Sequence, residues 1–298
     1  MGSLFYTMKK IIFAAILLGI AVFFCGYSTY RDDVNGRTAP LRKLNDLNSN
    51  MFRLGLPLGA KSMYVGEEEF TEARPCYFNS HHAAYAALLQ GKIDGYLFDS
   101  HTLDYVASKS PDYTVLPGSL GRVDIAIGVA PKNADLLGPI NQFIDQYKQD
   151  GTYQAMYTRW MKPESRTETG FVRPEVPEMP QIDAPASPTR TLVVGTCSQL
   201  EPLCFRPRGS EQFTGFDMEL LRRLAQHLNV RYIIRDLDYI TMMNELANGE
   251  LDIVVAGLNK TEERIQRQIL FSKNYIDSHI VALVRSAQIP AATADSNK

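Results

Sequence analysis

The thiols and imidazoles are the first side chains in this sequence that could do chemistry. Cys197 and Cys204 flank a short Ser-Gln-Leu-Glu-Pro-Leu loop, a spacing that permits a disulfide in an oxidising compartment and equally permits two buried free thiols. His81 and His82 are adjacent, so their side chains point in different directions, and no Cys-x-x-Cys pair is present. The sequence therefore predicts no metal site.

Charged residues at the ends of apolar runs are the second group of candidates. Asp99 directly follows the strand-like run 93–98, a position from which a carboxylate commonly caps the next helix. Arg264 stands beside two glutamates, which is ordinary for a solvated helix start. Taken alone, these residues indicate an anion and a cation without indicating a function.

Several classes of activity are excluded by missing motifs and by charge. The sequence contains no Gly-x-Ser-x-Gly elbow, no Walker loop and no Gly-x-Gly-x-x-Gly after a strand, so we expect no cofactor. Its formal net charge is −2, which leaves no basic field for phosphate backbones and excludes nucleic acid as a partner. With 45% hydrophobic and 21% charged residues, the composition is that of a globular protein.

The N-terminus predicts export. Two lysines precede an apolar run over residues 11–25, the pattern of a secretory signal. The run is short for a membrane-spanning helix, which needs about 20 apolar residues, although an uncleaved anchor stays an alternative. Its last residues, Val-Phe-Phe-Cys, resemble an imperfect lipobox, which makes Cys25 a candidate for lipid attachment. We expect a signal over 1–25, a tether over 26–39, and a protein that works in the periplasm or cell envelope.

A proline-rich stretch divides the rest of the chain. Residues 163–190 contain six prolines mixed with Glu, Ser and Thr, a composition that continues neither a helix nor a central strand. We therefore predict a linker over 163–190 with few contacts, flanked by folded segments over 40–162 and 191–286, and a disordered tail over 287–298.

Both segments alternate strands and helices, which predicts α/β units with a mainly parallel sheet. In the second segment we expect strands and helices in the order strand 191–196, helix 216–228, strand 231–234, helix 240–247 and strand 251–257. In the first segment we expect strands 52–56, 93–98 and 125–129, and helices 83–89, 102–107 and 137–147, followed by an amphipathic run to Trp160.

Short motifs in both segments resemble the polar-amino-acid periplasmic solute-binding proteins, family 3, the receptors of amino-acid ABC importers. The motifs are Thr214-Gly215-Phe216-Asp217, Leu251 to Gly257, Thr261-Glu262-Glu263-Arg264 and Phe271-Ser272 for the family's first lobe, and Leu44 to Asn48, Gly91-Lys92-Ile93-Asp94, Asp150 to Tyr153 and Arg159-Trp160 for its second lobe and C-terminal helix. The resemblance implies a two-lobed α/β fold of the type II periplasmic-binding-protein class.

The order of the lobes is reversed relative to that family, because the second-lobe motifs come first. A circular permutation, with the proline-rich linker as the new join, explains this order; half of one receptor followed by half of another is the alternative. Under permutation, the two segments form one body with a cleft, and the crossings between lobes run through 123–130 and 279–285.

The resemblance also implies the binding residues. The family's carboxylate-binding Arg lies seven residues after a Gly that ends a first-lobe strand, which matches Gly257 and Arg264. Asn259 stands where the family has a carboxyl-anchoring hydroxyl. The ammonium partner, an Asp that ends a second-lobe strand, matches Asp99. A Gly-rich turn whose backbone N–H groups face an anion matches Gly59, Ala60, Lys61 and Ser62.

Two further positions bear on ligand choice. Tyr239 occupies a place where an aromatic ring covers the ligand's side chain, and Leu200 replaces the matching aromatic residue near the first strand. A family acid in the same loop is replaced by Cys197. Lys61 is unusual in the turn; it either favours an acidic ligand or points to water.

The function implied by the resemblance is capture of an amino acid-like ligand, without catalysis, for the membrane permease of an ABC importer. An enzyme on the same scaffold, similar to a dehydratase acting on a small carboxylate, is one alternative, with Glu201 as the lobe-1 loop acid. A ligand-sensing ectodomain is another.

Overall fold

The computed structural model describes residues 40–162, 166–167, 170–172 and 174–290. The predicted signal, tether and Cys25 lie outside the described residues. Within the described part, no helix is both long and apolar enough to span a bilayer.

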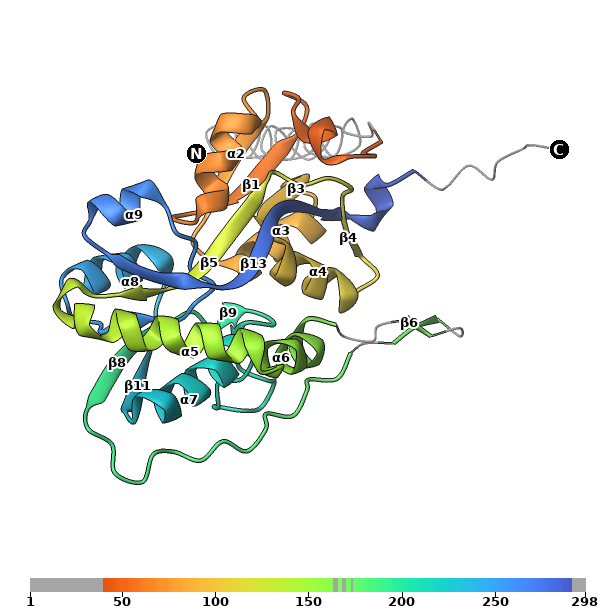
Figure 1. Ribbon diagram of the computed structural model, residues 1–298. Helices are drawn as coiled ribbons and strands as arrows, with labels where there is room; N and C mark the ends of the chain where they lie inside the picture. The colour runs from red at the N-terminus through yellow and green to blue at the C-terminus, as the bar shows by residue number, and fades with distance from the viewer. Residues whose placement is uncertain (1–39, 163–165, 168–169, 173, 291–298) are drawn as a thin grey trace, which may run out of the picture. The chain divides into compact units, whose positions relative to one another are not determined.

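Among the described residues, nine strands form one mixed sheet (Figure 1). Along the sheet the strands follow the order β11 (Arg231–Asp236), β8 (Thr191–Thr196), β12 (Ile253–Val254), β5 (Arg122–Val129), β13 (Leu270–Arg285), β3 (Gly95–Asp99), β1 (Arg53–Pro57) and β2 (Arg74–Phe78), with β4 (Tyr113–Val115) on β13. Strands β11, β8 and β12 are parallel, and so are β3, β1 and β2. We call these two groups and their helices the β8 lobe and the β1 lobe.

Two antiparallel strands join the lobes. The first part of β13 pairs with β5, while Ile280 to Leu283 pair with β3 and Leu283 to Arg285 with β4. The N-terminal segment thus supplies β1 to β5, and the C-terminal segment supplies β8, β11, β12 and β13. The two segments therefore share one sheet within this chain. The evolutionary permutation that would explain their order stays a prediction.

Helices cover the two lobes. Those of the β1 lobe are α2 (Lys61–Glu69), α3 (His81–Leu89) and α4 (Ser100–Ser108); those of the β8 lobe are α5 (Leu137–Gln149), α6 (Thr152–Met161), α7 (Phe216–Leu228), α8 (Tyr239–Ala247) and α9 (Glu262–Gln266). Short 3-10 turns are η1 (Leu44–Leu47), η2 (Pro131–Leu136) and η3 (Ser286–Gln288); two small hairpins are β6 (Arg166–Thr167) with β7 (Gly170–Phe171) and β9 (Gln199–Leu200) with β10 (Cys204–Phe205).

Helix α7 forms where its apolar spacing predicts it. Phe216, Leu220, Leu221 and Leu224 recur at helical intervals and are all buried. The helix ends at Asn229, whose left-handed backbone (φ 52°) stops it. Helices α5 and α6, from the other segment, pack against α7, with the Trp160 indole donating to Glu219 at 2.7 Å. The expected helix 216–228 is confirmed.

One expected strand is much shorter than its apolar run. The run 251–257 forms strand β12 only over Ile253–Val254, where it pairs with β8 and β5. Gly257 then takes a left-handed φ of 56°, and the chain continues along β5, where Asn259 forms an isolated bridge with Ile125.

The linker and the tail make more contacts than their composition indicates. Asn229 Nδ2 donates to the Ser187 carbonyl at 3.0 Å, and Thr189 N donates to the Asn229 carbonyl at 2.8 Å, so the end of the linker is bonded to the β8 lobe. Gln288 accepts from Leu41 N at 3.2 Å. The linker therefore has contacts near its end at Ser187 and Thr189, and η3 extends one residue past 287; the predicted bounds of linker and tail stay predictions.

Candidate ligand-binding site

Arg264 lies at the junction of the lobes. It sits in α9, whose N-cap Thr261 accepts from Arg264 N at 3.4 Å. The side chain is only 2% exposed, and burial lowers its pKa, although an Arg stays protonated. Its guanidinium donates to the Asn259 carbonyl and, at 2.9 Å, to the Gly59 carbonyl of the β1 lobe. This buried cation therefore bridges the lobes, and no acid pairs with it directly among the described residues.

Asp99 supplies a buried carboxylate from the other lobe. It ends β3 and is 1% exposed. Its side chain makes no capping hydrogen bond to α4, so the capping interpretation does not hold. Burial raises the pKa of Asp99 to about 7, against the lowering effect of the Asn259 hydrogen bond and of the Arg264 and Lys61 charges.

Asn259 links these two charged groups. Its Nδ2 donates to Asp99 Oδ2 at 3.2 Å, while its carbonyl accepts from Arg264. An Asn is suited to this bridge because it carries a side-chain donor and a main-chain acceptor. Arg264 and Asp99 therefore belong to one cluster from opposite lobes, with Asn259 between them rather than in direct contact.

Several polar side-chain atoms of the β1 lobe are buried with no hydrogen-bond partner among the described residues. They include Asp99 Oδ1 and Ser62 Oγ, and Ser62 lies three residues after Gly59, whose carbonyl accepts from Arg264. A buried polar group left unpaired costs about 1–3 kcal/mol, so each such atom calls for an explanation. Asp99 belongs to the Arg264 cluster through Asn259, and Ser62 lies in the first turn of α2, next to the 59–61 turn.

The rest of the predicted turn frames this cluster. Gly59 has a positive φ of 75°, and a side chain on it would crowd Ile240. Ala60 is buried at the start of α2 and makes no side-chain cap. Lys61 is partly exposed, and no ion pair is found for it among the described residues.

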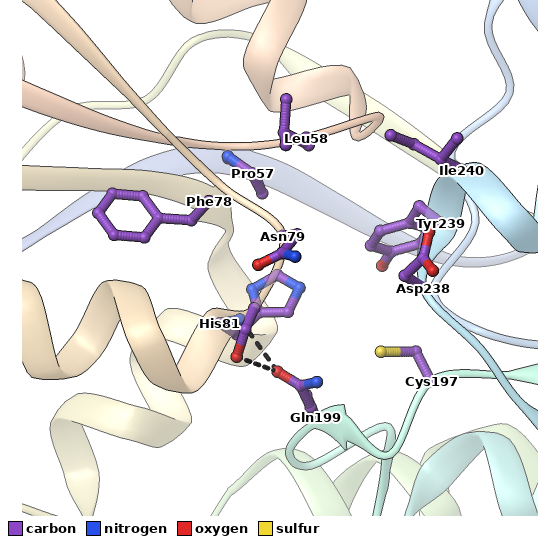
Figure 2. A pocket seen from close by; sticks show the side chains of 11 residues that line it. Pro57, Leu58, Phe78, Asn79, His81, Cys197, Gln199, Asp238, Tyr239 and Ile240 are labelled. Atoms are coloured by element: carbon purple, nitrogen blue, oxygen red, sulfur yellow. Dashed lines mark hydrogen bonds between the residues drawn. The ribbon is translucent and has the colours of Figure 1, made fainter.

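A small cavity lies between the lobes beside this cluster (Figure 2). It measures about 30 Å³, room for one or two water molecules. It is lined by Pro57, Leu58, Phe78, Asn79, Ser80 and His81 of the β1 lobe and by Cys197, Gln199, Asp238, Tyr239 and Ile240 of the β8 lobe. Tyr239 is therefore at the cavity, and its predicted role of covering a ligand's side chain stays a prediction. Leu200 does not line it; this residue is buried next to Gly257.

His81 and Gln199 are cavity residues that sequence reasoning missed as binding candidates. Gln199 Oε1 accepts from Ser80 Oγ at 2.8 Å and from His81 N at 3.1 Å, and dashed lines mark these two contacts in Figure 2. The His81 ring contacts Tyr96 OH through Nδ1 at 2.8 Å, and burial lowers the pKa of His81 to about 3, so the ring is neutral. Only the polar run around Ser80 hinted at these contacts.

The two cysteines and Glu201 lie in different surroundings. Cys197 and Cys204 are buried free thiols, so the predicted disulfide is absent; Cys197 lines the cavity, whereas Cys204 lies in β10 opposite Leu200. Glu201 pairs with Lys109 of the β1 lobe at 2.5 Å and does not line the cavity. In the described part of the chain, no group of three or more His, Cys, Asp or Glu side chains could hold a metal ion.

Comparison with known proteins relates the second segment of this chain to a family. Residues 192–291 match the model of the bacterial extracellular solute-binding proteins, family 3. The second segment of this chain is therefore similar to family 3. This match confirms the resemblance seen in the sequence, and the mixed sheet with its two lobes is a type II periplasmic-binding-protein-like fold.

The curated and solved relatives match this chain in part. The arginine-binding extracellular protein ArtP of Bacillus subtilis is 29% identical over 86 residues, which cover 29% of this chain and 32% of that protein. The virulence sensor BvgS of Bordetella bronchiseptica is 25% identical over 252 residues, 82% of this chain and 20% of the sensor. A solved ancestral arginine-binding protein bound to arginine is 32% identical and covers 26% of this chain and 34% of its own, with a TM-score of 0.25.

The matched part thus spans about a third of ArtP and a fifth of BvgS. The BvgS alignment covers 82% of this chain, so it includes segments on both sides of the linker. Because an alignment preserves chain order, the sensor contains both segments in the order found here.

Proposed function

We propose that this protein captures a small α-amino acid, or a similar small zwitterion, between its lobes outside the cytoplasm. The observation that carries the proposal is the cluster at the lobe junction. A buried cation and a buried carboxylate come from opposite lobes, and Asp99 Oδ1 and Ser62 Oγ beside them have no partner among the described residues.

The charges of the cluster complement an amino acid. A guanidinium binds a carboxylate with two parallel hydrogen bonds, so Arg264 holds the ligand's carboxylate in place of the Gly59 carbonyl. Asp99 Oδ1 accepts from the ligand's ammonium, and the Ser62 hydroxyl donates to its carboxylate. A ligand with only one of these charges leaves the opposite group buried and unpaired, which costs affinity.

Entry of such a ligand requires the lobes to separate. The cavity of about 30 Å³ is far smaller than an amino acid, and contacts such as Lys109–Glu201 cross between the lobes. Opening about the joined strands β5 and β13, followed by closure on the ligand, is the hinge motion of two-lobed receptors.

The biological role that we propose is delivery of the amino acid to the permease of an ABC importer, with the receptor held at the membrane through its N-terminus. A sensory role is the second candidate, favoured by the alignment with BvgS over 82% of this chain. Deleting the gene and measuring uptake of the bound amino acid separates the two: lost uptake supports the importer, and unchanged uptake supports the sensor.

The binding test is a thermal-shift screen of the twenty amino acids and small dicarboxylates, followed by calorimetry on variants. Arg264→Ala should weaken binding of the best amino acid by at least about thirtyfold, because it strands a buried carboxylate. Arg267→Ala is the matched control, since Arg267 lies three residues away but is exposed and pairs with Glu263 at 3.1 Å; we expect less than about a threefold change. Equal binding by wild type and Arg264→Ala would overturn the site.

A further inference from the structure

Asp217 is a buried carboxylate outside the ligand cluster. It lies in the first turn of α7 and is 0% exposed. Both of its oxygens are used: Oδ1 accepts from Tyr275 OH at 2.9 Å, and Oδ2 accepts from Gly257 N at 2.8 Å. Burying a carboxylate lowers the stability of the fold unless hydrogen bonds compensate for its lost hydration. The two groups that donate to Asp217 therefore indicate its role.

Tyr275 belongs to the strand that joins the lobes. In the pairing of β13 with β5, Asn274 is opposite Ala126 and Ile276 is opposite Ile125. Tyr275 is therefore the extra residue of a β-bulge, a feature that re-aims a side chain. Its carbonyl accepts from Tyr147 OH of α5, and its phenol reaches Asp217. The bulge is thus held from two sides.

Gly257 begins the loop that carries Asn259. Its φ of 56° is left-handed, and a Cβ at this position would lie 2.8 Å from Leu203 Cδ1, so only glycine fits. A buried backbone N–H needs an acceptor, and Asp217 provides it. Two residues later, Asn259 contacts Asp99 and Arg264.

We infer that Asp217 is a positioning residue for the ligand cluster: its carboxylate ties the Gly257–Asn259 loop to the bulge of β13 and so sets the place of Asn259. The consequence for binding rests on the proposed function. The positioning itself is measurable without any ligand.

Glu219 provides a matched control on the same helix. It is also 0% exposed, but it accepts from Arg159 and Trp160 of α6 and from Arg223 of α7. None of its hydrogen bonds reaches the 257–259 loop. Glu219→Ala therefore removes an equally buried carboxylate and leaves the loop's own bonds intact.

The experiment is amide hydrogen exchange followed by mass spectrometry on the exported chain without ligand. Asp217→Ala should raise exchange in residues 256–260 by at least about tenfold relative to wild type. Glu219→Ala should raise exchange in α6 and α7 but leave 256–260 near wild type. Asp217→Asn should restore protection, because its oxygen accepts from Gly257 N and its amide donates to the Tyr275 oxygen.

A milder variant covers failure of Asp217→Ala to fold. Tyr275→Phe removes one of the two hydrogen bonds of Asp217, so exchange in 256–260 should rise by a smaller factor. Equal loop exchange in Asp217→Ala and Glu219→Ala, or no change in Tyr275→Phe when Asp217→Ala is unfolded, overturns the inference. Failure of the proposed function gives a different result. In that case no amino acid binds to the protein, but Asp217→Ala and Glu219→Ala still differ in the exchange of residues 256–260.

Discussion

At the scale of single residues, the candidate site depends on charged and polar side chains that are buried. Asp99, Arg264 and Ser62 are each almost inaccessible to water, so every change of charge or partner there has a large electrostatic effect. Asn259 reduces the cost of burying the two charged groups, because it donates to Asp99 and accepts from Arg264. The same residues are therefore sensitive to pH and to conservative substitution.

Asp99 should make stability depend on pH. Burial raises its pKa from 3.8 to about 7, so between about pH 4 and pH 7 the folded state binds more protons at this site than the unfolded state. The free energy of unfolding therefore receives a contribution that falls as pH rises through this range. Asp99→Asn cannot ionise and should lack that contribution.

The measurement is urea unfolding of wild type and Asp99→Asn at about pH 5 and pH 7.5. The quantity to compare is the difference in the free energy of unfolding between the two proteins. This difference cancels the pH dependence contributed by His81, whose pKa is lowered, and by Asp217, whose pKa is raised. We expect Asp99→Asn to gain stability relative to wild type on going to the higher pH. A difference that does not change with pH would show that Asp99 titrates normally.

At the scale of elements, the lobes meet through the start of α3 and the β9 hairpin. Gln199 accepts from Ser80 Oγ and from His81 N at the first turn of α3. Lys109, at the end of α4, pairs with Glu201 in the loop between β9 and β10. Both contacts join a helix of the β1 lobe to the same small hairpin of the β8 lobe.

Removing both contacts should favour separation of the lobes. We expect the double variant Gln199→Ala with Lys109→Ala to have a larger radius of gyration than wild type in small-angle X-ray scattering, since each contact contributes about 1 kcal/mol. Arg235→Ala is the control, because it breaks a 2.8 Å pair with Glu245 inside the β8 lobe. An unchanged radius in the double variant would mean that other contacts hold the lobes together.

At the scale of the whole described body, both segments contribute to one sheet. Strand β5 of the first segment pairs along β13 of the second, and β13 continues onto β3 of the first. Buried side chains from both segments form a common core. Continuity of the peptide across the linker is therefore not what keeps the segments together.

Cutting the linker should leave the body intact. With a protease site introduced between Thr167 and Gly170, the cleaved halves should elute as one particle in native size-exclusion chromatography and separate only in denaturant. The uncut protein with the same insertion is the control. Elution of two smaller particles would contradict a shared sheet of the two segments.

The sequence alone determined the features that depend on local periodicity. The apolar spacing of α7 predicted its bounds of 216–228, and alternating strands and helices predicted the α/β class. The resemblance to the family also implied that Arg264 and Asp99 belong to a common site, which stays a prediction. These signals are local because helix and strand periods are properties of neighbouring residues.

Only the tertiary structure decided which distant groups meet. Asn259 and Asp99 are 160 residues apart, and Asp217 and Gly257 are 40 apart, so no local pattern encodes either hydrogen bond. The apolar run 251–257 could not reveal that its strand stops at Val254, because partner strands and the left-handed Gly257 set that limit. Cys197 and Cys204 likewise stay apart because the hairpin directs one thiol to the cavity and pairs the other with Leu200.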